Sequence, residues 1–234
     1  MGGQACVFYG AAQVSKDVDF LILADDGNYK KLRDALTALE ARRIAVPPFD
    51  PAVLERGHAV HFRCQAPGVQ GLRIDIMSRL RDLPSFAELW DRRTVIGDGE
   101  GNEFDLLSVP DLVAAKKTQR AKDWPVIEAL VSIHFQENQA DPKPHWIDFW
   151  LAEARSPELL VDLAARFPTE AGWLQSVRPL LALATSGDLP KLRAALDAEV
   201  RAEQDKDRRY WEPLKREMEA FRRAERERSA EDGD

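Results

Sequence analysis

Two aspartates separated by one residue, Asp17 and Asp19, open an apolar stretch near the start of the sequence. On a β-strand the side chains at positions i and i+2 project from the same face, so these two carboxylates would point together while Val18 enters the core. Neighbouring carboxylates repel each other unless a cation lies between them. Because all the donors are hard oxygen atoms, the pair favours Mg²⁺ or Mn²⁺ over zinc.

A third aspartate, Asp75, lies between Ile74 and Ile76 on a second expected strand. If that strand lies beside the first, three carboxylates can hold two divalent ions. Such a cluster suits phosphoryl or nucleotidyl transfer, in which one ion lowers the pKa of an attacking hydroxyl and the other stabilises the leaving pyrophosphate. Asp75 is also a candidate to accept the proton of the attacking hydroxyl.

Glycines and basic residues nearby are candidates to bind a nucleotide. Gly2 and Gly3 precede an expected helix from Ala5 to Ala12, and backbone N–H groups at such a helix start can approach phosphate oxygens closely. A basic cluster around a helix junction includes Lys116, which is the best placed of its members to reach a triphosphate. The alternative for this cluster is a solvated helix end that opposes the helix dipole.

These motifs together resemble the DNA polymerase β-type nucleotidyltransferase superfamily, in particular its small stand-alone and toxin-like members. The resemblance rests on the segments Gly2-Gly3-Gln4-Ala5, Ser15-Lys16-Asp17-Val18-Asp19-Phe20 and Ile74-Asp75-Ile76, and it covers roughly residues 1 to 135. It implies a mixed-sheet α/β core and magnesium-dependent transfer of a nucleoside monophosphate from an NTP to a hydroxyl acceptor. It also implies metal binding by three residues: Asp17, Asp19 and Asp75. We expect nucleotide contacts from five others: Gly2, Gly3, Ser15, Lys16 and Lys116.

The sequence departs from the superfamily pattern in two places. Gln13 stands where members often carry an arginine, so a guanidinium that could clamp a phosphate is replaced by a neutral amide. The glycine pair normally follows an apolar strand, and we expect the natural coding frame to extend upstream of Met1 and to supply it. These departures leave open a second class of function, a non-catalytic nucleotide-binding or partner-binding module with a degenerate fold.

The acceptor of the transferred group is also open, and RNA, protein and a small molecule are all candidates. A toxin-like nucleotidyltransferase restrained by an antitoxin-like protein partner is a further alternative.

The fold expected from the pattern is α/β (α+β), a mixed-sheet nucleotidyltransferase core over residues 1–139 followed by an all-helical C-terminal domain over residues 140–234. Alternating polarity predicts neighbouring strands at 58–65 and 72–77, and a glycine-rich turn predicts a weak hairpin over 94–107. Helical spacing follows at 29–42 and 84–90. Ser108 is expected to cap a helix that runs to about Gln119, and another helix is expected over 123–135.

After Asp141 the strand pattern ends and helical hairpins are expected. Apolar stripes at helical spacing predict five helices, over 146–154, 157–167, 173–184, 189–201 and 208–226. The last two carry facing stripes, which indicates an antiparallel pair.

Composition restricts the class of protein. The chain has 234 residues and a formal net charge of −7, which argues against a dedicated duplex-DNA binder. No apolar run approaches the ~18 residues of a membrane span, and the sequence shows no secretory signal, so we expect a cytoplasmic protein without a membrane partner.

Cys6 and Cys64 are expected to be buried and free. His58 and His61 are three apart on one expected strand and face opposite sides, so they are expected to lie on the strand surface without sharing a metal ion.

Overall fold

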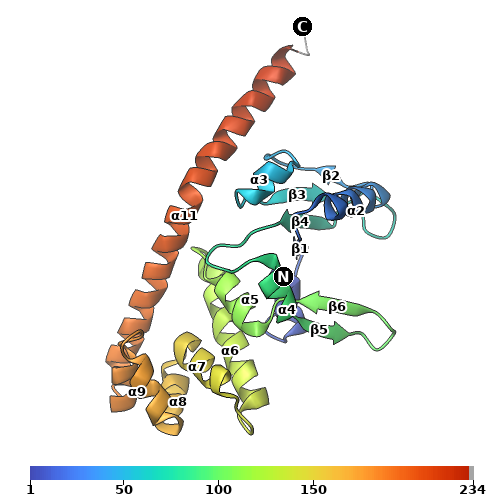
Figure 1. Cartoon of the computed structure of the whole chain (residues 1–234). Helices are drawn as coiled ribbons and strands as arrows, with labels where there is room; N and C mark the ends of the chain where they lie inside the picture. Colours follow the sequence, from blue (N-terminus) through green and yellow to red (C-terminus); the bar gives the residue numbers. More distant parts are fainter. Residues whose placement is uncertain (232–234) are drawn as a thin grey trace. The chain divides into compact units, whose positions relative to one another are not determined.

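The computed structural model describes residues 1–231 (Figure 1), and contacts among them define two compact units. The first unit contains Met1–Val7, Ala12–Ala115 and the chain from Arg208 onward. The second contains Phe8–Ala11 and Lys116–Asp207. Each unit is described by itself below.

A small mixed sheet forms the centre of the first unit. Its strand order is β1 (Asp17–Leu21), β4 (Arg73–Met77), β3 (Val60–Arg63) and β2 (Arg42–Arg43). Strands β1 and β4 are parallel, whereas β4 with β3 and β3 with β2 are antiparallel. The predicted pairing of the strands around 58–65 and 72–77 is therefore confirmed, and the fold is mixed α/β with a small mixed sheet.

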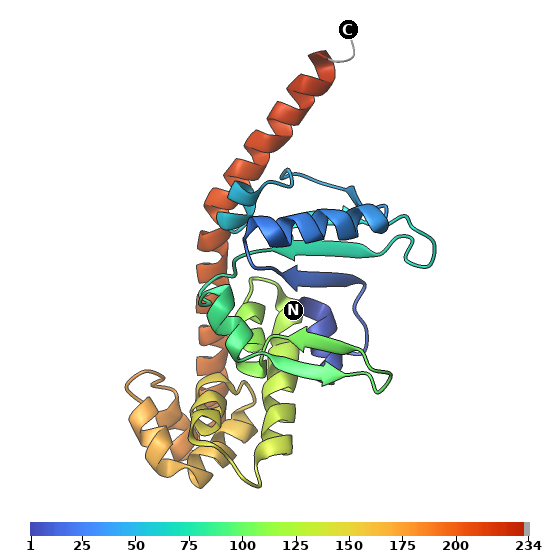
Figure 2. The same cartoon turned by 45° about the vertical axis from the view of Figure 1, so that its right-hand side comes forward.

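Helix α2 (Asp26–Ala38) packs on one face of this sheet, as Figure 2 shows. Its N-cap is Asp25, whose side chain accepts a hydrogen bond from the backbone N–H of Asn28. Alternate strand residues point toward α2 because successive side chains leave opposite faces of a strand. The core beneath the helix contains Tyr29, Leu36, Leu54, Val60, Phe62, Cys64, Ile74 and Ile76. The opposite face of β1 and β4 carries Asp17, Asp19, Arg73 and Asp75, together with Leu21 and Met77 at the strand ends.

Shorter elements complete the first unit. They are α1 (Gly2–Phe8), α3 (Pro51–Glu55), α4 (Phe86–Asp91), α5 (Val109–Lys116) and the hairpin of β5 (Thr94–Gly97) with β6 (Glu103–Leu106). The predicted hairpin is confirmed. At the start of α5 the Ser108 hydroxyl accepts a hydrogen bond from the backbone N–H of Asp111 at 3.3 Å, as expected for the predicted cap. Strand β2 and helix α3 were not predicted, because each is too short to show a periodic pattern.

The end of the long helix α11 (Leu189–Glu231) packs against α3 and the residues that follow it. Glu217 Oε2 accepts a hydrogen bond from Arg56 Nε at 2.8 Å. The same oxygen lies 3.0 Å from the Nε2 atom of the buried His58. The ring of Phe221 makes an edge contact with the ring of His58. These contacts attach this part of α11 to the first unit.

The second unit is helical in the described chain. It contains η1 (Ala121–Asp123), α6 (Trp124–Asn138), α7 (Pro144–Glu153), α8 (Pro157–Arg166), α9 (Pro168–Leu174), α10 (Leu181–Ser186) and the first part of α11. The buried ring of Trp150 lies 5.1 Å from the ring of Phe135, so α6 packs with the helices that follow it. The domain boundary expected between residues 139 and 140 stays a prediction.

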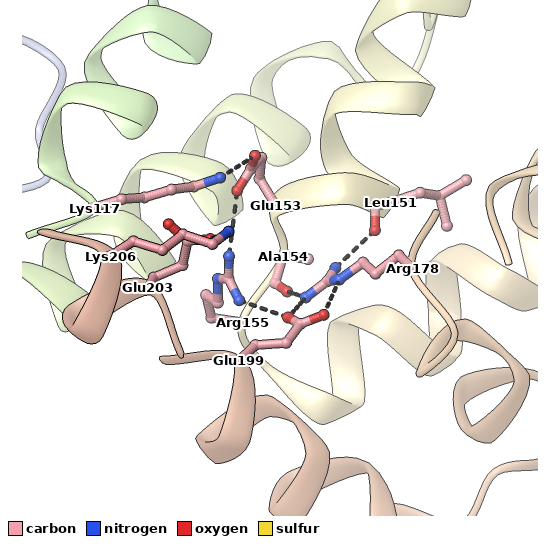
Figure 3. Close-up of polar contacts among 9 residues, drawn as sticks. All are labelled: Lys117, Leu151, Glu153, Ala154, Arg155, Arg178, Glu199, Glu203 and Lys206. Atoms are coloured by element: carbon pink, nitrogen blue, oxygen red, sulfur yellow. Dashed lines mark hydrogen bonds and ion pairs between the residues drawn. The ribbon is translucent and has the colours of Figure 1, made fainter. Parts of the chain in front are cut away.

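A network of ion pairs joins α7, α11 and the segment between α9 and α10 within the second unit (Figure 3). Glu199 on α11 accepts hydrogen bonds from Arg155 Nη1 at 2.7 Å and from Arg178 Nη2 at 2.8 Å. Arg178 also donates to the backbone carbonyls of Leu151 and Ala154. Burial and the nearby charge of Arg178 lower the pKa of Arg155. Both guanidinium groups are buried, and Glu199 compensates their positive charge.

Two helix predictions in this region are wrong. The antiparallel pair expected over 189–201 and 208–226 is a single helix, α11. The residues between, 202–207, contain neither Gly nor Pro, and Pro213 is accommodated inside the helix. The helix expected over 173–184 is divided between α9 and α10, because Pro179 lacks a backbone N–H and disfavours helical geometry in the residue before it.

None of the helices in residues 1–231 combines the length and the apolar character needed to cross a membrane. Cys6 and Cys64 are free and buried, as the sequence predicts.

Candidate metal centre

The pairing of β1 with β4 puts the three aspartates on one face of the sheet. In the parallel register Asp19 is opposite Asp75, and Asp17 is opposite Arg73. Directly paired residues of neighbouring strands project from the same face, and so do residues two apart on one strand. The face opposite α2 therefore carries Asp17, Asp19 and Asp75 on adjacent strands. Strand β3 adds His61, which is opposite Asp75 in the antiparallel register.

The carboxylate of Asp19 is seated against the glycines that begin α1. The backbone N–H of Gly3 donates a hydrogen bond to Asp19 Oδ2 at 3.3 Å. A Cβ atom at Gly2 would lie 2.7 Å from Asp19 Cβ and closer still to the carboxylate, and the φ of Gly2 is +73°. Both the space and the backbone conformation thus require glycine at position 2. In this structure the amide of Gly3 binds Asp19, whereas the sequence predicts that it binds a phosphate.

The carboxylate of Asp17 is oriented by Ser15. The Ser15 hydroxyl lies 3.0 Å from Asp17 Oδ1 and 3.0 Å from the backbone oxygen of Asp17. A Cβ atom at Gly3 would lie 3.0 Å from Ser15 Cβ and closer to the hydroxyl, so Gly3 leaves the room that Ser15 occupies. Ser15 is therefore a positioning residue for Asp17. Lys16 is exposed in the bend directly before β1.

The carboxylate of Asp75 is almost wholly buried and is bound by two neighbours on the same face. Arg73 donates from Nε to Oδ1 at 2.7 Å and from Nη2 to Oδ2 at 2.9 Å, which is the bidentate geometry of a strong arginine–carboxylate pair. His61 Nδ1 lies 2.8 Å from Oδ1 of the same carboxylate and 3.1 Å from Arg73 Nη2. Both oxygens of Asp75 are therefore engaged.

These contacts shift the ionisation of the pair. Burial raises the pKa of Asp75, but the hydrogen bonds from His61 and Arg73 lower it by more, so the pKa lies below its usual value. The hydrogen bond to Asp75 raises the pKa of Arg73. A carboxylate with a lowered pKa is a weak base. The proton-accepting role of Asp75 stays a prediction.

The residues present fit a divalent cation in the chemistry of their donors. Three carboxylates on adjacent strands supply hard oxygens, and the cradle at Gly2 holds one of them in place. Within residues 1–231, however, no three acidic, histidine or cysteine side chains converge closely enough to hold a metal ion as they stand. At Asp75 both oxygens are bound by Arg73 and His61.

Lys116 lies in the other unit, at the end of α5, where its Nζ is 3.7 Å from Asp123 Oδ1. Asp123 is buried and also binds Thr118 and Arg120. Lys116 therefore compensates a buried carboxylate, and its expected contact with a nucleotide stays a prediction.

Arg73 and His61 were missed as members of the site by the sequence-based reasoning. The signal that could have found Arg73 is its position two residues before Asp75 on a strand of alternating polarity, which puts both side chains on one face. His61 required the register of β3 with β4, which depends on the turn that joins them.

Comparison of the sequence with models of known protein families and with curated proteins gave no match.

Proposed function

We propose that the protein is a metal-dependent nucleotidyltransferase that transfers a nucleoside monophosphate from an NTP to a hydroxyl acceptor. The observation that carries this proposal is the register of β1 with β4, which aligns Asp17, Asp19 and Asp75 on one face. The glycine cradle around Asp19 supports it, since a glycine is required there for the carboxylate to be seated. The resemblance to polymerase β-type nucleotidyltransferases rests on these same residues.

In the proposed reaction an acceptor oxygen forms a bond to the α-phosphorus of the NTP. The bond from that phosphorus to the bridging oxygen of the β-phosphate breaks, and pyrophosphate leaves. Asp17, Asp19 and Asp75 would hold Mg²⁺ or Mn²⁺, which when bound lowers the pKa of the attacking hydroxyl and stabilises the charge on pyrophosphate. Ser15 and Gly3 keep the first two carboxylates in position. The hydroxyl proton is released to water as the bond to phosphorus forms.

The test is transfer of label from NTPs labelled at the α-phosphate to total RNA, to the proteins of a cell extract or to small hydroxyl compounds. Asp75→Asn is expected to abolish transfer and to leave NTP binding measurable, since the fold and the other two carboxylates remain. Asp34→Asn is the matched control, because Asp34 is exposed on α2 and the charge change is the same. Transfer by the Asp75→Asn variant at the unaltered rate would remove Asp75 from the mechanism.

A second candidate function is a nucleotide-binding or partner-binding module without catalysis. The observation that favours it is the engagement of both Asp75 oxygens by Arg73 and His61. Gln13, in the place of the family's arginine, agrees with this alternative. Calorimetry that detects NTP binding, together with an absence of label transfer to every fraction, would decide for this module and against the enzyme.

A further inference from the structure

Arg73 is a cationic group bound directly to the aspartate face. Its guanidinium donates to both oxygens of Asp75, and in the β1–β4 register it lies opposite Asp17. The side chain of Asp75 is only 11% exposed, whereas that of Arg73 is 39% exposed. The carboxylate is therefore fixed in the sheet, while the guanidinium has solvent into which it can move.

A divalent cation and this guanidinium need the same oxygen lone pairs. An ionised carboxylate offers about four lone-pair sites, and at Asp75 three of them are used, two by Arg73 and one by His61. Bidentate coordination of a metal ion by both oxygens therefore requires the loss of at least one of these contacts. Exchange of one cation for another leaves the buried carboxylate compensated throughout. Such an exchange avoids the large penalty of an unpaired buried charge.

We propose that Arg73 is the resident counter-ion of Asp75, and that a divalent cation completes the centre by displacing its guanidinium, which then binds the triphosphate of the NTP. The inference rests on the proposed function. A released guanidinium is suited to the second task because its planar fork matches phosphate oxygens in bidentate geometry. Arg73 would then couple nucleotide binding to metal binding, and it supplies on β4 the phosphate-binding cation that Gln13 does not provide.

The test measures free Mn²⁺ by electron paramagnetic resonance in titrations of the full chain. Arg73→Ala removes both arginine hydrogen bonds from Asp75 and leaves the contact of His61 with Oδ1. This variant is expected to bind Mn²⁺ at least about tenfold more tightly, since the charge-assisted hydrogen bonds of the guanidinium no longer compete. Arg63→Ala is the matched control. Arg63 is exposed and is paired with Arg73 in the β3–β4 register, so the variant removes the same charge from the same face. We expect a change of less than about threefold for this control, because exposed charges are screened by solvent and salt.

Nucleotide binding gives the second readout. Arg73→Ala is expected to bind Mn²⁺–ATP about tenfold more weakly than the unaltered chain does, although it binds Mn²⁺ alone more tightly. Arg73→Lys keeps the positive charge but loses the planar guanidinium. Its affinity for Mn²⁺–ATP should lie between that of the unaltered chain and that of Arg73→Ala. Thermal unfolding of each variant establishes that it is folded.

The outcomes separate the inference from the function. Unchanged or weaker Mn²⁺ binding by Arg73→Ala, when Asp19→Asn abolishes the Mn²⁺ binding of the unaltered chain, overturns the inference and leaves the proposed function standing. Binding of Mn²⁺ by both chains, at least about tenfold tighter in Arg73→Ala, supports the inference. Binding by Arg73→Ala alone would show that the cation does not displace the guanidinium, and it overturns the inference. If neither the unaltered chain nor Arg73→Ala binds Mn²⁺, both the inference and the proposed function fail.

Discussion

Replacement of Gly2 by alanine tests whether the seat of Asp19 needs a glycine. Alanine at a φ of +73° is strained by roughly 1–2 kcal/mol. Its Cβ would also lie 2.7 Å from Asp19 Cβ and would displace the carboxylate, which costs the hydrogen bond from Gly3 to a charged group, about 1.5 kcal/mol. We expect Gly2→Ala to lower the free energy of unfolding of the first unit by about 2.5–3.5 kcal/mol, the sum of these effects.

Gly68→Ala is the control that isolates the steric part. Gly68 has a φ of +84°, and a Cβ there would meet no atom within 4 Å, so only the backbone strain of roughly 1–2 kcal/mol applies. Native-state hydrogen exchange of peptides that cover β1 and β4 measures both variants in the same unit. If Gly2→Ala is no less stable than Gly68→Ala, the seat of the Asp19 carboxylate does not require a glycine at position 2.

Two further predictions concern the ion pairs that attach α11. Glu199→Gln leaves the buried Arg178 without its carboxylate and should destabilise the second unit by about 2–3 kcal/mol in thermal unfolding, whereas Glu158→Gln, which removes an exposed pair, should change the stability by less than about 1 kcal/mol. Equal effects of the two would show that the network contributes little. The hydrogen bond to His58 lowers the pKa of Glu217, so the stability from this glutamate is complete above its unfolded pKa of about 4.3 and is lost as the pH falls through its lower folded-state pKa. Glu217→Gln should abolish that part of the pH dependence in unfolding measured between about pH 5 and 3, and an unchanged profile would contradict it.

Alternating polarity predicted the central strands well. The residues around Val60 and around Ile74 alternate between a buried face and a polar one, so their sheet and its two faces follow from the sequence. The continuity of α11 did not follow, because its apolar stripes suggested two facing helices. Leu192 and Leu196 are buried in the second unit and Leu214 in the first, so the two stripes serve different units of the protein and do not face each other.

The candidate site was predictable in part. The positions of Asp17 and Asp19 on one face follow from their spacing, and their alignment with Asp75 needed only that the two strands be neighbours. The engagement of Asp75 by His61 was beyond the sequence, because it depends on a third strand and on the register that brings His61 opposite Asp75. Local periodicity identifies the face of a strand, but it does not identify the neighbouring strand.

We propose that the aspartates of β1 and β4 form a divalent-cation site. Paramagnetic broadening of backbone amide signals by substoichiometric Mn²⁺ locates the bound ion without any assumption about catalysis. We expect the amides of residues 17–19 and 73–75 to broaden first, and Asp19→Asn to remove the effect. Broadening that begins at other amides, or that persists unchanged in Asp19→Asn, would show that these aspartates do not bind the cation.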